Sequence, residues 1–114
     1  MSMRTPLREP SYFVLAALLD GPLHGYAVIK RVDELSAGRV RLAAGTLYAA
    51  LDRLAAEELL TVVSEEVVNG RARRYYGLTE NGSAAVRAEA ERMAAAAALV
   101  IKRKHAARTV VKPA

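Results

Sequence analysis

The sequence of 114 residues contains no cysteine and no tryptophan, and only one of its residues is phenylalanine. Without cysteine the chain has no disulfides, no thiolate nucleophile and no Cys-ligated zinc, as is usual in a reducing compartment. Its two histidines stand apart with no cluster of ligands around either. We therefore expect no metal and no cofactor.

Long hydrophobic segments are also missing. The longest apolar run, residues 94–101, is too short to span a bilayer, and the N-terminus lacks the pattern of a signal peptide. The sequence thus predicts a cytoplasmic protein that does not enter a membrane. Its net charge of +5 and pI of about 9.9 favour an anionic partner such as nucleic acid or an anionic membrane surface.

The composition is nevertheless sufficient for one globular domain. Hydrophobic residues make up 53% of the chain, but many of them are alanine, which buries little area. A small alanine-rich chain is a candidate for dimerisation, because two copies together can build a core that one copy cannot.

Residues 42–60 form the most informative stretch. Read with helical spacing, one stripe is apolar and consists of Leu47, Leu51 and Leu54. A second stripe carries Thr46, Ala49 and Arg53, and it is small near the start and basic further on. Such a helix can bring its first turn close to base edges in the DNA major groove. An ordinary amphipathic core helix is the alternative interpretation.

Two further helices are expected before this stretch. The first covers residues 12–19 with Leu18 and Leu19 buried, and residues 20–22 end it. The second covers residues 25–35, with His24 at the N-cap position and Tyr26 facing inward.

The connector over residues 36–42 contains Gly38, which suits a helix C-cap. It also carries Arg39 and Arg41 just before the third helix. These two arginines either flank a DNA groove or belong to a solvated loop.

A β-hairpin is expected next. Residues 60–67 alternate in polarity, Asn69-Gly70 is a strong hairpin turn signal, and residues 71–78 form the return strand, which places Glu66 opposite Arg73. The tip and return strand carry three arginines: Arg71, Arg73 and Arg74. They suit phosphate contacts, although edge charges that prevent aggregation are the alternative.

The last predicted element is a long helix over residues 79–105 with Thr79 as its N-cap. Apolar residues recur along it at alternating spacings of four and three, as in a short coiled coil: Val86, Ala90, Met93, Ala97 and Val100. This seam packs either on its own domain or on a second copy, and we favour a homodimer.

The order of elements predicts a fold that is mainly α with a small β-hairpin. Residues 9–78 would form a winged helix-turn-helix domain that binds DNA, and residues 79–108 a C-terminal dimerisation helix. In this arrangement the third helix occupies the major groove, and the hairpin follows the backbone or enters the neighbouring minor groove.

Several motifs in this order resemble the PadR-like transcriptional regulators. They are Leu23-His24-Gly25-Tyr26, Gly45-Thr46-Leu47-Tyr48 and Arg74-Tyr75-Tyr76-Gly77-Leu78-Thr79. The resemblance implies a prokaryotic repressor that binds palindromic operators as a homodimer. It also implies release by a small hydrophobic effector such as a phenolic acid or a drug. Gly45, Thr46 and Tyr48 match the recognition-helix motif that touches DNA, whereas Ala49 stands where the family often has proline.

We therefore predict a sequence-specific DNA-binding transcriptional regulator. Phosphate contacts are expected from Arg39, Arg41, Tyr48, Arg71, Arg73 and Arg74, and base contacts from Thr46, Ala49 and Arg53. A nucleophile–base pair, a phosphate loop and a metal cluster are all missing from the sequence, so we do not expect an enzyme. The alternative is a winged-helix adaptor that binds proteins and not DNA.

Overall fold

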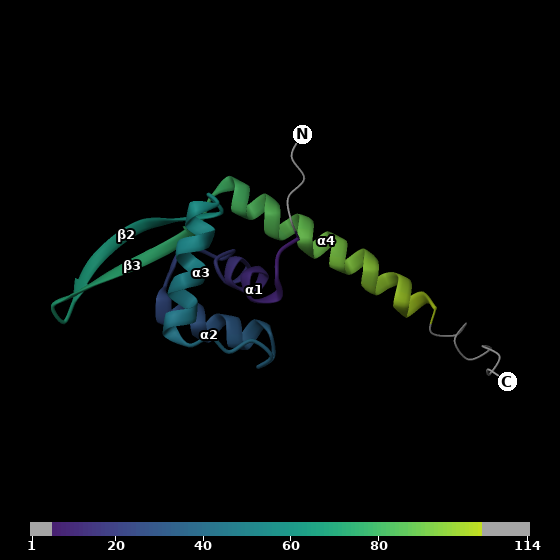
Figure 1. The fold of residues 1–114 in the computed structure, drawn as a ribbon, viewed down its shortest axis with the longest axis horizontal. Coiled ribbons are helices and arrows are strands. Elements are labelled where there is room, and N and C mark those ends of the chain that lie inside the picture. The colour runs from purple at the N-terminus through teal and green to yellow at the C-terminus, as the bar shows by residue number, and fades with distance from the viewer. Residues whose placement is uncertain (1–5, 104–114) are drawn as a thin grey trace.

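The computed structural model describes residues 6–103. Its elements, in chain order, are α1 (Glu9–Ala17), β1 (Leu23–His24), α2 (Gly25–Leu35), α3 (Ala44–Ala56), β2 (Leu60–Val68), β3 (Arg71–Leu78) and α4 (Glu80–Lys102). Figure 1 shows the hairpin and α4 extending to opposite sides of a bundle formed by α1, α2 and α3. The predicted fold, mainly α with a hairpin and a long C-terminal helix, is confirmed.

The core lies between the first three helices. The apolar stripe of α3 is fully buried, with Leu47 and Leu51 at 0% exposure and Leu54 at 1%. On α2 the buried stripe is Val28 and Val32, which are separated by one turn and both at 0% exposure. The third helix is therefore anchored by one face only, and its other face is free.

Two predicted core residues lie outside the core. Leu19 is 42% exposed, because α1 ends at Ala17 and Leu19 falls in the following turn. Tyr26 is 72% exposed, because it lies across α2 from the stripe that contains Val28 and Val32. The prediction that these two side chains face inward was wrong.

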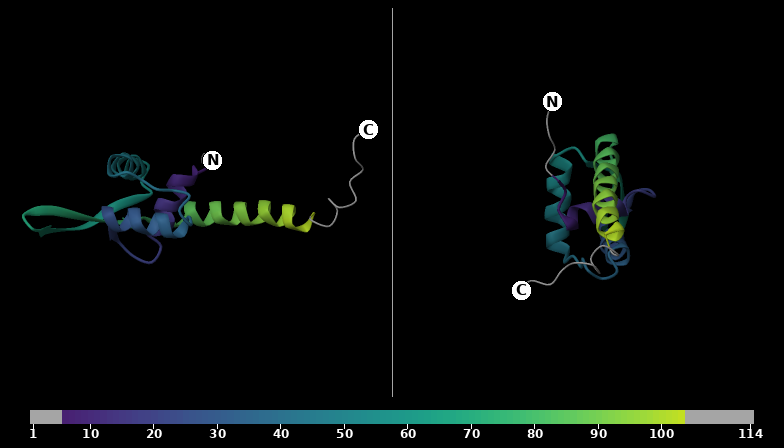
Figure 2. Two further views of the ribbon diagram at one scale, coloured as in Figure 1. Left: turned by 90° about the horizontal axis from the view of Figure 1, so that it is seen from below. Right: turned by 90° about the vertical axis from the view of Figure 1, so that its right-hand side faces the viewer.

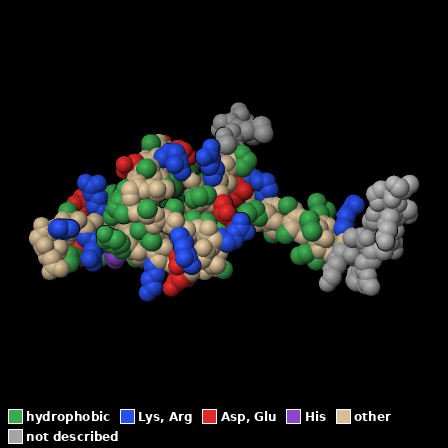
Figure 3. Space-filling model, turned by 60° about the horizontal axis from the view of Figure 1, so that its bottom comes forward, with side chains coloured by type: hydrophobic (Ala, Val, Ile, Leu, Met, Phe, Trp, Pro, Cys, Tyr) green, Lys and Arg blue, Asp and Glu red, His purple; other side chains and the backbone are tan. Residues whose placement is uncertain are grey.

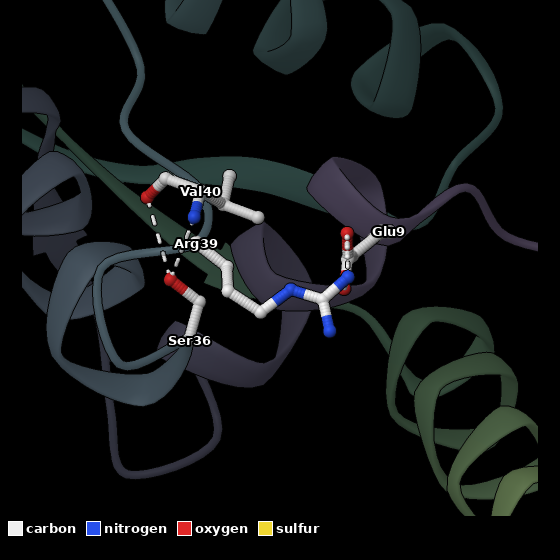
Figure 4. A network of polar contacts seen from close by, with 4 residues as sticks. All are labelled: Glu9, Ser36, Arg39 and Val40. Atoms are coloured by element: carbon white, nitrogen blue, oxygen red, sulfur yellow. Dashed lines mark hydrogen bonds and ion pairs between the residues drawn. The ribbon is translucent and has the colours of Figure 1, made fainter.

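Side-chain hydrogen bonds fix the connector between α2 and α3. The buried Ser36 accepts a hydrogen bond from the Val40 backbone amide at 2.9 Å, and Val40 itself is 7% exposed. Arg39 meets Glu9 on α1, with Nη2 3.0 Å from a carboxylate oxygen (Figure 4). These contacts hold the connector against both α1 and α2, and so they fix where α3 begins.

The hairpin has the predicted turn and register. Asn69 and Gly70 both have positive φ angles, of 52° and 76°, which a type I′ turn requires. Val68 pairs with Arg71, and Glu66 pairs with Arg73. A bulge between Val62 and Ser64 adds one unpredicted irregularity.

The sheet also has a third strand that we do not predict from sequence. Its order is β1-β3-β2, with Leu23 paired to Tyr76 and His24 paired to Tyr75. Two residues are too few for a periodic pattern, so this strand depends on its contact with β3. His24 also caps α2 as predicted, with Nδ1 accepting a hydrogen bond from the Ala27 amide at 3.4 Å.

The start of α4 is tied to the end of α3. The Thr79 hydroxyl accepts a hydrogen bond from the Gly82 amide at 2.9 Å, which confirms the predicted N-cap. The same hydroxyl donates to the Glu58 carbonyl at 2.6 Å, and the Thr79 amide donates to the Leu59 carbonyl at 3.2 Å. One residue thus joins three segments of the chain.

The two halves of α4 differ in their surroundings. The first half belongs to the domain, since Ala85, Val86 and Glu89 are buried. Glu89 also accepts a hydrogen bond from the Leu7 amide and pairs with Arg92. Residues 91–102 are exposed throughout, and Figure 2 shows this half projecting away from the other elements. At 1.5 Å per residue the projecting part is about 18 Å long.

This packing changes the reading of the predicted seam. Val86 is 2% exposed and lies in the core of its own chain, so it offers no surface to a partner, contrary to the prediction. The change from packed to projecting helix occurs near residue 90, within α4, and not at its first residue. The predicted helix end near residue 105 and residues 104–108 of the predicted dimerisation segment lie outside the described residues.

Gly82→Ala should destabilise the fold, because a Cβ at this position would overlap the Leu59 carbonyl group. We expect the free energy of unfolding, measured by urea denaturation at one protein concentration, to fall by about 1–3 kcal/mol. Gly45→Ala is the matched control, since a Cβ there would have no heavy atom within 4 Å. The control should leave stability unchanged or raise it by up to about 1 kcal/mol. Equal stabilities for the two variants would contradict this account of the junction.

Candidate nucleic-acid interface

A groove of about 870 Å³ lies between α3 and the hairpin. It is lined by residues from β1 and the start of α2, from α3 and from the hairpin: His24, Gly25, Tyr26, Tyr48, Asp52, Val68, Asn69, Arg71, Ala72, Arg73, Arg74 and Tyr76. Figure 3 shows basic side chains on the hairpin, at the end of the molecule opposite α4, and others spread over the rest of this face. The groove therefore combines arginines with tyrosine hydroxyls.

Tyr48 reaches the groove because Gly25 gives it room. A Cβ at Gly25 would stand 2.9 Å from Cζ of Tyr48 and closer still to its hydroxyl oxygen. The Tyr48 ring therefore lies directly against the N-terminus of α2, and its side chain remains 44% exposed. This contact joins Gly25 of the first glycine–tyrosine motif to Tyr48 of the second.

Tyr76 lies deeper, beneath the same groove, at 6% exposure. Its pKa is above the ordinary value of 10.0, first because the phenol is buried and then because of the charges of Tyr48 and Asp52, while Arg74 opposes the shift. The phenol therefore stays protonated at neutral pH, and its hydroxyl remains a hydrogen-bond donor.

The three hairpin arginines differ in their partners. Arg73 and Arg74 each face a carboxylate across the hairpin, with closest N···O distances of 4.0 Å to Glu66 and 3.9 Å to Glu65. Arg71, at the tip, forms no ion pair with any carboxylate of residues 6–103. All three arginines line the same groove.

The connector arginines lie elsewhere. Arg39 pairs with Glu9 on α1, and Arg41 Nε is 3.5 Å from Asp33 on α2. Neither lines the groove. Their side chains are 73% and 79% exposed, so they remain accessible to a long partner that extends past α3.

Arg53 is held against α1. Its Nη2 donates a hydrogen bond to the Ser11 hydroxyl at 2.6 Å, and its Nε is 4.0 Å from Glu57. Ser11 is buried, and this bond satisfies its hydroxyl. The predicted base contact by Arg53 is therefore not supported, since its guanidinium is engaged on the α1 side of α3.

The free face of α3 is left with small residues. Gly45, Thr46 and Ala49 are all exposed, and a Cβ at Gly45 would meet nothing within 4 Å. This face has no bulky side chain in its first turn and a half, and so the backbone of α3 can come close to a partner.

Sequence reasoning did not assign Tyr26 or Asp52 to the groove. Tyr26 was predicted to be buried, and the spacing of Val28 and Val32 is the signal that would have placed it outside. Asp52, which was not predicted as a site residue, also lines the groove. This carboxylate will repel a phosphate group, and it can only accept hydrogen bonds, not donate them.

Neither a metal centre nor a membrane span is found in the described part of the chain. Residues 6–103 contain no group of three or more histidine and acidic side chains arranged to hold a metal ion. None of the helices in this range combines the length and apolar character that crossing a bilayer requires.

Two curated proteins are similar to the chain. One is an uncharacterized 37.1 kDa protein in transposon TN4556 of Streptomyces fradiae, 41% identical over 92 residues, which are 81% of this chain and 24% of that protein. The other is the transcriptional regulator Rv3488 of Mycobacterium tuberculosis, 42% identical over 73 residues, or 64% of each protein. The chain thus spans less than two thirds of the length of either relative.

Solved structures show the same fold. A PadR family transcription regulator from Clostridium difficile R20291 matches with a TM-score of 0.71 at 22% identity, over 83% of this chain and 97% of that one. Bacillus subtilis PadR in complex with operator DNA matches with a TM-score of 0.62 at 22% identity, over 70% of this chain and 46% of that one.

The model of the transcriptional regulator PadR-like family matches residues 14–88. This range runs from α1 through the hairpin into the packed half of α4, and it contains the whole groove. The chain therefore belongs to the PadR-like family of transcriptional regulators.

Proposed function

We propose that the protein binds double-stranded DNA, with α3 in the major groove and the hairpin beside it. The observation that carries this proposal is the groove between α3 and the hairpin, which is lined by three arginines and two exposed tyrosine side chains. Arginine guanidinium groups and tyrosine hydroxyls can donate hydrogen bonds to phosphate oxygens. One DNA strand would pass through the groove.

The side chains would divide the work of recognition. Tyr48, Arg71, Arg73 and Arg74 would contact phosphates, with Tyr26 as an additional donor. Gly45, Thr46 and Ala49 would face the bases, since they lie on the free face of α3. Arg39 and Arg41 would contact the flanking backbone after exchanging their carboxylate partners for phosphates. Membership in a family of transcriptional regulators and a fold shared with a relative seen on operator DNA support this reading.

The protein would act as a homodimer joined through α4. The helix face that carries Val86 within the core continues outward through Met93, Ala97 and Val100, where nothing in residues 6–103 covers it. Val100 is 74% exposed and Met93 is 41% exposed. A second copy of this helix would cover the face, and the remaining seam would then consist of Ala90, Met93, Ala97 and Val100.

As a regulator the dimer would bind a palindromic operator and repress transcription. Its two α3 helices would lie roughly 34–36 Å apart, one turn of DNA, in successive major grooves. A small hydrophobic effector would release the DNA by binding better to a dimer with a different spacing. Mobility shifts on the DNA upstream of its own gene, at two salt concentrations, test DNA binding. A protein-binding adaptor would give no shift.

Arg71→Ala should weaken binding to specific and random duplexes alike, because a phosphate contact is indifferent to sequence. The slope of log K against log salt should become shallower by about one unit. Fluorescence anisotropy over a salt series measures both quantities. Arg87→Ala is the matched control, since it removes the same charge from α4, which leaves the domain opposite the hairpin (Figure 1). Equal salt slopes for both variants would contradict the assignment.

Thr46→Val should lower the ratio of specific to random affinity, because it removes a hydroxyl from the free face of α3 and keeps the shape. We expect a loss of about five- to tenfold in this ratio. Arg53→Ala should leave the ratio unchanged and reduce stability instead, since its guanidinium is bonded to Ser11. Competition binding and urea denaturation separate the two effects. The opposite pattern would restore Arg53 as a base-reading residue.

Ala97→Glu should dissociate the dimer, because it places a charge in the seam. The dissociation constant of the dimer should rise by at least roughly 100-fold, measured as molar mass by sedimentation equilibrium. Ala95→Glu is the matched control, since the same change then falls on the opposite face of the same exposed half-helix. A wild-type monomer at micromolar concentration, or equal effects of the two changes, would refute the α4 interface.

A further inference from the structure

Two glutamates on β2 of the hairpin face two of the arginines on β3. Glu65 and Glu66 are consecutive residues of β2, so their side chains point to opposite faces of the hairpin, and the register places each directly opposite an arginine of β3. The ion-pair distances, 3.9 Å and 4.0 Å, are at the long end of the range for such contacts. All four side chains are partly exposed, from 39% for Arg73 to 60% for Arg74. These pairs are loose and open to solvent.

Glu66 is further restrained by a second donor. The Tyr75 hydroxyl donates a hydrogen bond to its carboxylate at 2.6 Å, and the Tyr75 ring makes an edge contact with His24, with centroids 5.6 Å apart. The carboxylate is therefore held on the same face of the hairpin as Arg73. Arg71 has no such partner within residues 6–103.

A carboxylate and a phosphate are alternative acceptors for the same guanidinium fork. If Arg73 binds a phosphate, it gives up Glu66, and the carboxylate then stands close to the DNA backbone as a like charge. Resting on the proposed function, we infer that the two carboxylates compete with DNA phosphates for the arginines opposite them. They lower the affinity of the hairpin for DNA of any sequence, and they leave Arg71 as its strongest phosphate contact.

This competition limits binding to random DNA, where phosphate contacts supply nearly all the affinity. Specific binding also draws on the face of α3, which the carboxylates do not touch. Glu65 and Glu66 are thus determinants of specificity that act through the arginines and not through the bases.

The test is a double-mutant cycle in the full chain on a random-sequence duplex. Glu66→Gln removes the charge and keeps an oxygen that accepts the Tyr75 hydrogen bond, so the hairpin should stay folded. We expect binding to tighten by about two- to fivefold, the range of an exposed ion pair. Arg73→Ala should then cost more affinity in the Glu66→Gln background than in the wild type, because Arg73 is fully available only there.

The cycle distinguishes competition for Arg73 from a general electrostatic repulsion between the carboxylate and DNA. A carboxylate that only repelled DNA would give effects that add, and additive effects would overturn the inference. Asp52→Asn is the control, since it neutralises a carboxylate that lines the groove beside Arg73 and has no arginine ion pair in the described residues. Its effect should add to that of Arg73→Ala. Glu65→Gln with Arg74→Ala forms a second cycle with the same expected signature.

Failure of the inference is distinguishable from failure of the proposed function. Weaker binding by Glu66→Gln would mean that the carboxylate orients Arg73 for DNA, and it would overturn the inference while leaving DNA binding intact. A wild-type protein that binds neither random nor promoter DNA would instead overturn the proposed function, and the inference with it.

Discussion

The junction at Leu59 and Thr79 is the constraint on which the rest of the structure depends. Here α3 has just ended, β2 begins, β3 has just ended and α4 begins. The Thr79 hydroxyl bridges Glu58 and Gly82, and its amide reaches Leu59. Because Gly82 has no side chain, α4 approaches the Leu59 carbonyl more closely than any other residue would allow. The direction of α4 is therefore fixed relative to both α3 and the hairpin.

This arrangement connects the two ends of the molecule mechanically. A change in the angle at which α4 meets a partner would move α3 and the hairpin together, because all three leave the same junction. In the proposed dimer, a ligand would need only to alter the crossing of the two α4 helices to change the separation of the two α3 helices. No flexible linker within residues 6–103 absorbs such a motion between α3 and α4.

The features that sequence predicts well are local. The Leu47, Leu51 and Leu54 stripe, the Asn69-Gly70 turn and the Thr79 cap are each specified by residues within a few positions of one another, and all three are found as expected. Two of the features that sequence misses depend on distant partners. The short β1 strand exists through β3, and Arg53 turns toward Ser11, 42 residues earlier. The hairpin register predicts that Glu66 faces Arg73, but only the tertiary structure shows the groove that Arg71, Arg73 and Arg74 line.

The two-part character of α4 has a consequence for how the protein responds to its own abundance. One continuous apolar face of α4 packs first in the core of its own chain and then, in the proposed dimer, against the second copy. Assembly and folding would then be thermodynamically linked, because pairing stabilises only the folded chain. When the concentration of the protein in the cell falls, the fraction of dimer would fall as well, and the remaining monomers would unfold more easily. Degradation of these monomers would then lower the protein concentration further.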